Sequence, residues 1–153
     1  MRKWTSAAVG LLLLALPGAA GAQASIDHIA INVTDQQRSI DFYHDAFGLN
    51  EITAPFGGVP GSPRWLRMAN GVELHVQAIK TPFTAPPRFI HFALAVPDLD
   101  AVIAYMDAKK REWSNYLGEK GKINRTRKDG VRQIYVQDPD GYWIEVNEAR
   151  RTN

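Results

Sequence analysis

The chain begins its folded part with alternating positions within residues 26–33, where the apolar Ile29, Ile31 and Val33 are interleaved with His28, Ala30 and Asn32. Ile29 and Val33 fall on one side of an extended chain, whereas His28 and Asn32 fall on the other, because successive side chains in a strand point to opposite faces. This pattern predicts a strand that buries one face and leaves a face with a histidine free for other contacts.

A change of period follows the first strand. Asp35 stands where a helix cap is expected, and the apolar side chains of Ile40, Tyr43 and Phe47 recur at three- to four-residue spacing up to Gly48. The spacing predicts a helix between Asp35 and Gly48. Three short strands are then predicted near residues 51–54, 65–68 and 72–78.

The same order of elements recurs in the second half of the chain. Residues 28–35 align without a gap with residues 91–98, so that each copy opens on a histidine and reaches an Asp at a helix start. The second copy predicts a strand over 89–96, a helix from Asp98 to about residue 110, and strands near 123–126, 131–137 and 142–147, with residues 112–122 unassigned. The chain is therefore interpreted as two modules, 26–79 and 88–148, joined by a proline-containing linker, 80–87.

The repeat places chemically active residues at matching positions. Glu145 lies between two apolar residues in the last strand, and in the corresponding strand of the first copy Glu73 and His75 share a face. If both sheets curl inward, His28, His91, Glu145 and one of Glu73 or His75 line one cavity. Two imidazoles with carboxylates suit Zn, Ni, Fe or Mn, and ionisable groups that face an interior are costly unless they are paired or bound to metal. We therefore predict a divalent metal site, with the choice between Glu73 and His75 left open by the residues themselves.

The first 22 residues are typical of an export signal. They combine Arg2 and Lys3, an apolar run and a small-residue cleavage site, and the run is too short for the ~20 residues of a membrane-spanning helix. We expect cleavage near Gln23, no membrane anchor afterwards, and a periplasmic or secreted protein consisting of one domain, residues 23–153. The absence of cysteine leaves packing, and a metal, to hold this exported fold.

Charge argues against nucleic acid as a partner. Removal of the two basic residues of the signal changes the balance of 18 basic against 16 acidic residues to 16 against 16. A neutral chain lacks the positive field that nucleic-acid binding needs, and we interpret the locally basic stretch 120–132 as a solvated loop face.

Two segments resemble the vicinal-oxygen-chelate superfamily, which includes glyoxalase I, extradiol dioxygenases and bleomycin resistance proteins. They are Arg38-Ser-Ile-Asp-Phe-Tyr43 followed by Gly48-Leu49, and Asp138-Pro-Asp-Gly-Tyr-Trp-Ile-Glu145; both are similar to glyoxalase I. The resemblance covers residues 26–148. It implies an α+β fold of two βαβββ modules that form a U-shaped, barrel-like mixed sheet around a metal.

The resemblance also implies the site residues. One ligand comes from the first and one from the last strand of each module, which gives His28, Glu73, His91 and Glu145. Alignment on Gly71 and Gly141 would instead set His75 opposite Glu145, but the Val-Glu-Leu context is similar to glyoxalase I and favours Glu73. His75, Asn32 and Trp143 are then expected near the metal ligands or the substrate.

The expected activity is that of a metal-dependent, glyoxalase I-like lyase or isomerase. In this chemistry the metal binds two vicinal oxygens of a small substrate, Glu145 and Glu73 transfer protons, and an enediolate forms. Asn32 stands where the resemblance implies an arginine for glutathione, so we expect a substrate other than the methylglyoxal–glutathione hemithioacetal.

Two alternatives follow from the same resemblance. An Fe(II) extradiol-type dioxygenase would use two histidines and one carboxylate, and a fourth ligand at Glu73 speaks against it. A bleomycin-resistance-like binding protein would hold its ligand between aromatic side chains without metal, and the retention of four metal-type residues speaks against that. Members of the superfamily commonly form homodimers, sometimes with modules exchanged, so a homodimer is expected.

Overall fold

The first module consists of one helix and four strands. In the computed structural model, which describes residues 24–56 and 59–149, its elements are β1 (His28–Val33), α1 (Gln36–Phe47), β2 (Asn50–Ile52), β3 (Arg64–Arg67) and β4 (Glu73–Ala78). The strands form one mixed sheet in the order β1-β4-β3-β2, with β1 parallel to β4 and the other pairs antiparallel. The export signal predicted for residues 1–22 lies outside the described residues.

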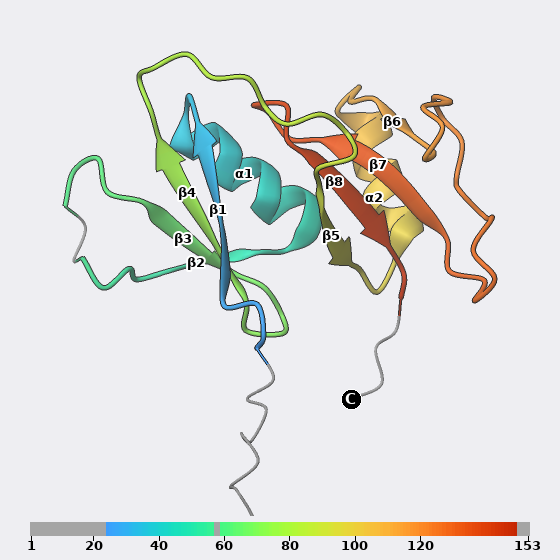
Figure 1. Ribbon diagram of the computed structural model, residues 1–153, viewed down its shortest axis with the longest axis horizontal. Helices are drawn as coiled ribbons and strands as arrows, with labels where there is room; N and C mark the ends of the chain where they lie inside the picture. Colours follow the sequence, from blue (N-terminus) through green and yellow to red (C-terminus); the bar gives the residue numbers. More distant parts are fainter. Residues whose placement is uncertain (1–23, 57–58, 150–153) are drawn as a thin grey trace, which may run out of the picture.

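The second module repeats this topology. It contains β5 (Phe92–Ala95), α2 (Leu99–Ala108), β6 (Trp113–Ser114), β7 (Gln133–Gln137) and β8 (Trp143–Asn147), with the sheet order β5-β8-β7-β6. The α+β class and the paired βαβββ modules predicted from the repeat are confirmed. Figure 1 shows two separate sheets, with α1 lying between them in that view, rather than one closed barrel.

The helix boundaries follow from the capping residues. The Asp35 and Asp98 carboxylates accept hydrogen bonds from the backbone N–H groups of Arg38 (3.1 Å) and Ala101 (3.0 Å). Gly48 ends α1 in the left-handed conformation, at φ 69°, which suits a residue without a Cβ. Both predicted caps are therefore confirmed.

One strand prediction was wrong. The third strand of the second module is β6 at Trp113–Ser114, inside the segment left unassigned, whereas the stretch near 123–126 contributes only an isolated bridge between Asn124 and Gln133. The pairing of β6 with β7 places Trp113 against the core. In residues 123–126, by contrast, Ile123 is the single large apolar residue, and its neighbours are basic or polar. Such a stretch cannot bury a face.

A single hydrophobic core joins the modules. It combines apolar side chains from both sheets and both helices, among them Ile31 and Phe42 of the first module and Leu94 and Met106 of the second. The apolar faces of both sheets pack into this one core, and this packing fixes how the two modules are placed relative to each other.

The turn between β7 and β8 anchors α1 to the second module. The Tyr43 hydroxyl donates to the buried Asp138 carboxylate over 2.9 Å, and Asp140 accepts from the Thr34 hydroxyl (2.6 Å) and the Arg38 guanidinium (3.1 Å). Burial and the neighbouring Asp138 raise the pKa of Tyr43, so this hydroxyl stays protonated and can donate. The Asp-Pro-Asp-Gly motif is thus a connector between the modules.

The polar faces of the two sheets carry the predicted site residues and do not contribute to the core. Along β1 the buried positions are Ile31 and Val33, whereas His28, Ala30 and Asn32 are exposed. Among the residues described, no helix is long and apolar enough to cross a bilayer.

Candidate functional site

The first module brings His28, Glu73 and His75 together on the polar face of its sheet. His28 is directly opposite Glu73 in the parallel pair β1–β4. The His28 and His75 rings are stacked with centroids 4.2 Å apart, and Trp65 stacks on the other side of His75 at 3.9 Å. The three rings form a column that fixes the position of both imidazoles.

Each imidazole of this module has a carboxylate as partner. Asp27 accepts from His28 Nδ1 over 2.9 Å, and Glu73 accepts from His75 Nε2 over 3.2 Å. Glu73 is also held by the Arg67 guanidinium at 2.8 Å. Hydrogen bonds from Arg67 and then His75 lower the pKa of Glu73, which keeps this carboxylate ionised. A carboxylate on one nitrogen of a histidine is the arrangement that orients the other nitrogen toward a metal.

The second module brings His91 and Glu145 together in the same way. Their Nε2 and Oε2 atoms are 3.6 Å apart, and the side chains are 22% and 13% exposed. His91 Nδ1 donates to the backbone carbonyl of Arg88 over 2.7 Å, so Nε2 is the ring nitrogen that faces Glu145. Nε2 is therefore the nitrogen of His91 that a metal could contact.

Glu145 is held by neighbours on both of its oxygens. The Tyr135 hydroxyl donates to Oε2 over 2.7 Å, the Asn147 amide donates to Oε1 over 2.8 Å, and the Arg127 guanidinium is 3.8 Å from Oε1. Burial and the hydrogen bond to Glu145 raise the pKa of Tyr135, so its hydroxyl remains a donor across the physiological range.

The strand register shows which positions of the two modules correspond. In the second module Glu145 is opposite both Tyr135 and Ala93, the residue two places after His91. In the first module the residue opposite Ala30, two places after His28, is His75. His75 is therefore the structural counterpart of Glu145.

Glu73 corresponds by the same register to Trp143. Glu73 is opposite Arg67, and Trp143 is opposite Gln137, in equivalent antiparallel pairs. The diagonal contact between His91 and Glu145 thus has its equivalent in the stack of His28 on His75. This register favours His75 over Glu73 as the fourth ligand position, the choice that the residues had left open.

The two clusters remain separate within one chain. No group of three or more histidine, aspartate or glutamate side chains within metal-binding reach occurs in the described parts of the chain. The structure thus brings together His28, Glu73 and His75 in one place and His91 and Glu145 in another. The donor types suit a divalent ion, but the described residues of a single chain do not gather three of them within reach of one ion.

The remaining predicted residues lie on the same faces. Asn32 is at the far end of β1, where its backbone N–H donates to the Tyr142 hydroxyl over 3.1 Å. Trp143 lies under the Arg88 guanidinium, whose central carbon is 4.1 Å from the centre of the indole. Trp143 thus belongs to the surroundings of the second cluster, and Asn32 to the junction between the modules.

Two buried polar atoms on these faces lack a partner among the described residues. They are Trp65 Nε1, beside His75, and Ser114 Oγ, which shares a face with Tyr135. A buried donor without an acceptor is costly, so such groups mark places where another molecule completes the contact.

Sequence reasoning missed Arg67, Tyr135 and Arg88. Tyr135 and Arg67 alternate with core residues in β7 and β3, and the pattern alone places them on the polar face without showing that they hold Glu145 and Glu73. Arg88 follows the linker and carries no periodic signal. Only the antiparallel register identifies their carboxylate or aromatic partners.

The geometry defines a class of protein with two equivalent βαβββ modules, each presenting an imidazole-containing cluster on the outer face of its sheet. Comparison with known proteins identifies the family. The Glyoxalase/Bleomycin resistance protein/Dioxygenase superfamily matches residues 25–146, and the chain belongs to this superfamily.

Relatives and solved structures agree with this assignment. The chain is 30% identical to the uncharacterized protein YwbC of Bacillus subtilis over 126 residues, covering 78% of this chain and 94% of that protein. It is 28% identical to a probable lactoylglutathione lyase of Vibrio parahaemolyticus, covering 82% and 91%. The fold is similar to that of oxidase ChaP-H2, with a TM-score of 0.68 at 22% identity over 85% of this chain and 97% of that one.

Proposed function

We propose that this protein is a metal-dependent enzyme of the lyase or isomerase type, acting on a small substrate that binds through two neighbouring oxygens. The observation that carries the proposal is the repeated cluster: each module presents an imidazole beside a second metal-type side chain, His28 with His75 and His91 with Glu145. Similarity to a probable lactoylglutathione lyase supports the reaction class.

The site is completed by a second copy of the chain. Exposed apolar side chains lie beside each cluster. Phe56, 53% exposed, contacts Trp65 of the first cluster, and Phe89 (75%), Ile90 (64%) and Leu117 (79%) are exposed near the second. Tyr116 connects this exposed surface to the second cluster, because its ring contacts both Phe89 and Tyr135. A homodimer that pairs the first module of one chain with the second module of the other buries these side chains and brings four ligands together.

The ligands in this arrangement are His28, His75, His91 and Glu145. A divalent ion bound by them would polarise the two substrate oxygens and stabilise the charge that develops there. The register supports His75 in place of Glu73 in the ligand set. Glu73 lies 3.2 Å from His75 Nε2 and is kept ionised by its hydrogen bonds from Arg67 and His75. It is the carboxylate of the two clusters without a ligand role in this arrangement, and we assign to it the acceptance of a proton from the substrate.

Glu145 has a fixed position in the proposed site. Donors on both of its oxygens, from Tyr135 and Asn147, restrict its movement, as Arg67 and His75 do for Glu73. The two carboxylates are therefore distinguished by the strand register, which gives Glu145 the ligand position. The proton-transfer role that the sequence assigned jointly to Glu145 and Glu73 is accordingly proposed for Glu73 alone.

A second candidate is an Fe(II)-dependent extradiol-type dioxygenase. The specific observation in its favour is the strand register. It supports His75 in place of Glu73 as the fourth ligand, so that Glu145 is the single carboxylate among the proposed ligands. Non-haem Fe(II) oxygenases use two histidines and one carboxylate and keep open positions, so this candidate requires that only two of the three imidazoles bind the metal together with Glu145. In this candidate Glu73 orients His75 and takes no proton.

The experiment measures metal and reaction together on protein purified without chelators. We expect one divalent ion per chain, a dimer by light scattering, and incorporation of solvent deuterium into small hydroxy-carbonyl substrates. Oxygen uptake with catechols in place of deuterium incorporation would select the dioxygenase. Protein without stoichiometric metal contradicts both candidates and leaves the binding-protein alternative.

Matched variants sharpen the result. Glu145→Gln removes a ligand and is expected to lower the activity at least 10²-fold. Asp45→Asn changes a carboxylate on the exposed side of α1 and is the control. The methylglyoxal–glutathione hemithioacetal belongs in the substrate panel, because its turnover would contradict the expectation drawn from Asn32.

We also propose that the protein works outside the cytoplasm. Detection of a mature chain that starts near Gln23 tests this proposal.

A further inference from the structure

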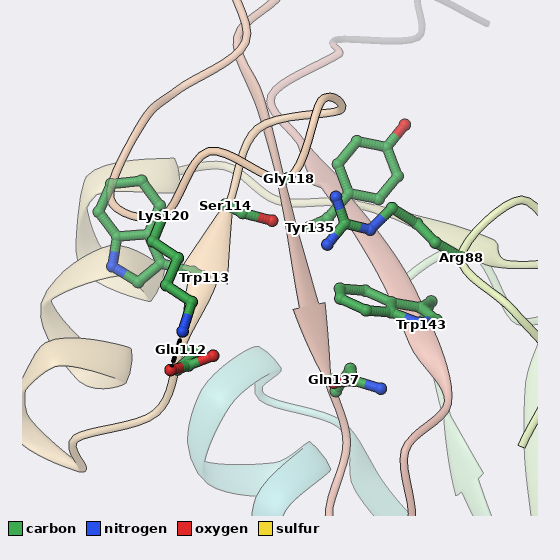
Figure 2. A pocket seen from close by; sticks show the side chains of 9 residues that line it. All are labelled: Arg88, Glu112, Trp113, Ser114, Gly118, Lys120, Tyr135, Gln137 and Trp143. Atoms are coloured by element: carbon green, nitrogen blue, oxygen red, sulfur yellow. Dashed lines mark hydrogen bonds and ion pairs between the residues drawn. The ribbon is translucent and has the colours of Figure 1, made fainter.

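A small cavity adjoins the second cluster. It measures about 60 Å³ and is bordered by strands β6, β7 and β8 and by the segment that precedes β5. Its wall includes Arg88, Ser114, Lys120, Tyr135 and Trp143. Figure 2 shows the Arg88 guanidinium between the rings of Tyr135 and Trp143, with the Ser114 hydroxyl pointing toward it. The cavity therefore combines a cation, aromatic surfaces and a hydroxyl.

Arg88 is positioned with one edge of its guanidinium free. Its Nη1 atom donates long hydrogen bonds to the backbone carbonyls of Asn115 (3.3 Å) and Tyr116 (3.4 Å), and its plane lies over Trp143. Within the residues that the structure covers, its side-chain hydrogen bonds are the two from Nη1, and no carboxylate pairs with it. The Nε–Nη2 edge is the fork that binds a carboxylate through two parallel hydrogen bonds.

The other cation of the cavity is already neutralised. Lys120 Nζ is 2.5 Å from the Glu112 carboxylate at the rim of the cavity. Ser114 is 5% exposed, and its Oγ lacks a hydrogen-bond partner among the residues described. A ligand that accepts hydrogen bonds would satisfy Ser114 and Arg88 at once.

Gly118 permits the approach of Arg88. It has φ +86°, and a Cβ built there would lie 3.1 Å from Arg88 Nη1, tighter than ordinary contacts. The conformation and the close approach both suit glycine. The guanidinium of Arg88 thus lies between the face of the Trp143 ring and the backbone at Gly118.

We propose that this cavity binds a carboxylate group of the substrate, held by the free edge of Arg88 and by the Ser114 hydroxyl. The proposal rests on the function proposed above, because it treats the cavity as part of the same substrate site. Tyr135 and Trp143 border the cavity, and the Tyr135 hydroxyl contacts Glu145 at 2.7 Å. Trp143 and Glu145 are two residues apart on β8, so the carboxylate lies roughly 7 Å from the metal ligand. The substrate class is therefore a small carboxylic acid whose chelating oxygens stand a few bonds away from the carboxylate.

The test uses metal-free protein, so that it does not depend on the metal site. Pyruvate, its neutral methyl ester and inorganic phosphate are titrated into the full-length protein after chelator treatment, and binding is followed through the Trp indole resonances by NMR. We expect pyruvate to bind and to shift a resonance that Trp143→Phe removes, with at least tenfold weaker binding of the methyl ester.

Variants decide which groups are responsible. Arg88→Gln and Arg88→Lys should each weaken pyruvate binding at least fivefold, because neither keeps the two-pronged donor. Ser114→Ala should weaken it less, and Arg125→Gln, which changes an exposed arginine elsewhere, should leave it unchanged. Equal binding of pyruvate and its methyl ester, no effect of either Arg88 variant, or binding of phosphate in place of pyruvate overturns the proposal. If the chelator-treated protein binds pyruvate but does not bind a divalent metal when one is added, the proposed function is contradicted and the carboxylate site is supported.

Discussion

At the scale of single residues, the first-module cluster differs from what sequence context predicts. The Val-Glu-Leu context favours Glu73, whereas the pairing of β1 with β4 sets His75 in the position that Glu145 has in the second module. Residues two apart in a strand share a face, so no pattern of alternation separates Glu73 from His75. The alignment on Gly71 and Gly141 sets His75 opposite Glu145, and the hydrogen-bonded register, a long-range property, agrees with that alignment.

The two assignments differ in their effect on metal affinity. His75→Ala is expected to weaken binding of Zn²⁺ or Mn²⁺ at least 10²-fold, since it removes a direct ligand. Glu73→Gln should weaken it about tenfold, because it removes only the carboxylate that orients His75. Isothermal titration of each ion into chelator-treated protein gives both values.

Trp65→Phe serves as the control for this comparison, because it keeps an aromatic ring against His75 while changing no candidate ligand. A larger loss of affinity in Glu73→Gln than in His75→Ala would restore Glu73 as the ligand and reject the argument from register.

At the scale of elements, helices and turns follow from local sequence more directly than short strands do. Asp35, Asp98 and Gly48 fix the helix ends through contacts within a few residues. The two-residue strand β6 has no such local signal, because its pairing with β7 depends on residues some 20 positions later. This dependence explains why the strand predicted near 123–126 was placed too late.

An ion-pair group ties α2 to the end of β8. Arg132 donates to the Asp100 carboxylate at 2.9 and 3.1 Å and to the Glu148 carboxylate at 2.8 Å through both Nε and Nη2. Hydrogen bonds from Arg132 lower the pKa of both carboxylates below their ordinary values of 3.8 and 4.5. The folded chain therefore binds fewer protons at these groups than the unfolded chain in mildly acidic solution.

This difference predicts a dependence of stability on pH. Lowered pKa values contribute stability that is present above about pH 4.5 and is lost as the pH falls through the folded-state values. In Arg132→Gln the free energy of unfolding should be smaller at pH 7, and its decline between pH 5 and pH 3 should be shallower than in the parent chain. Urea unfolding across this range measures both.

Lys122→Gln breaks the exposed pair between Lys122 and Glu119 and is the control. A decline in Arg132→Gln as steep as in the parent chain would show that other carboxylates, and not Asp100 and Glu148, determine the acid sensitivity.

At the scale of the whole molecule, the arrangement of the modules decides whether the predicted ligands can meet. The repeat predicts a histidine at matching positions of both modules, and the structure places His28 beside His75 and His91 beside Glu145. The repeat cannot predict that the shared core, together with contacts such as Tyr43 to Asp138, joins the modules by their opposite faces. Sequence periodicity fixes which face is apolar, whereas the partner of that face is a tertiary property.

The separation of the clusters gives the proposed dimer a chemical role. A single chain presents His28 with His75 in one direction and His91 with Glu145 in another, each bordered by exposed apolar side chains. Two chains related by a twofold axis can supply two complete sets of four ligands. The central claim is therefore that each metal site contains one cluster from each of two chains.

The most direct measurement of this claim mixes two variants that each lack one cluster. Chains with His28→Ala and chains with Glu145→Gln are each expected to bind little metal alone, because both sites of either homodimer are damaged. After unfolding and refolding together, the mixed dimers should regain one intact site, formed by the first module of the Glu145→Gln chain and the second module of the His28→Ala chain. Tight Zn²⁺ binding at one ion per mixed dimer is the predicted result. If the mixed dimers form and still bind no metal tightly, each site would have to lie within one chain, and the claim of a metal site shared between two chains would be contradicted.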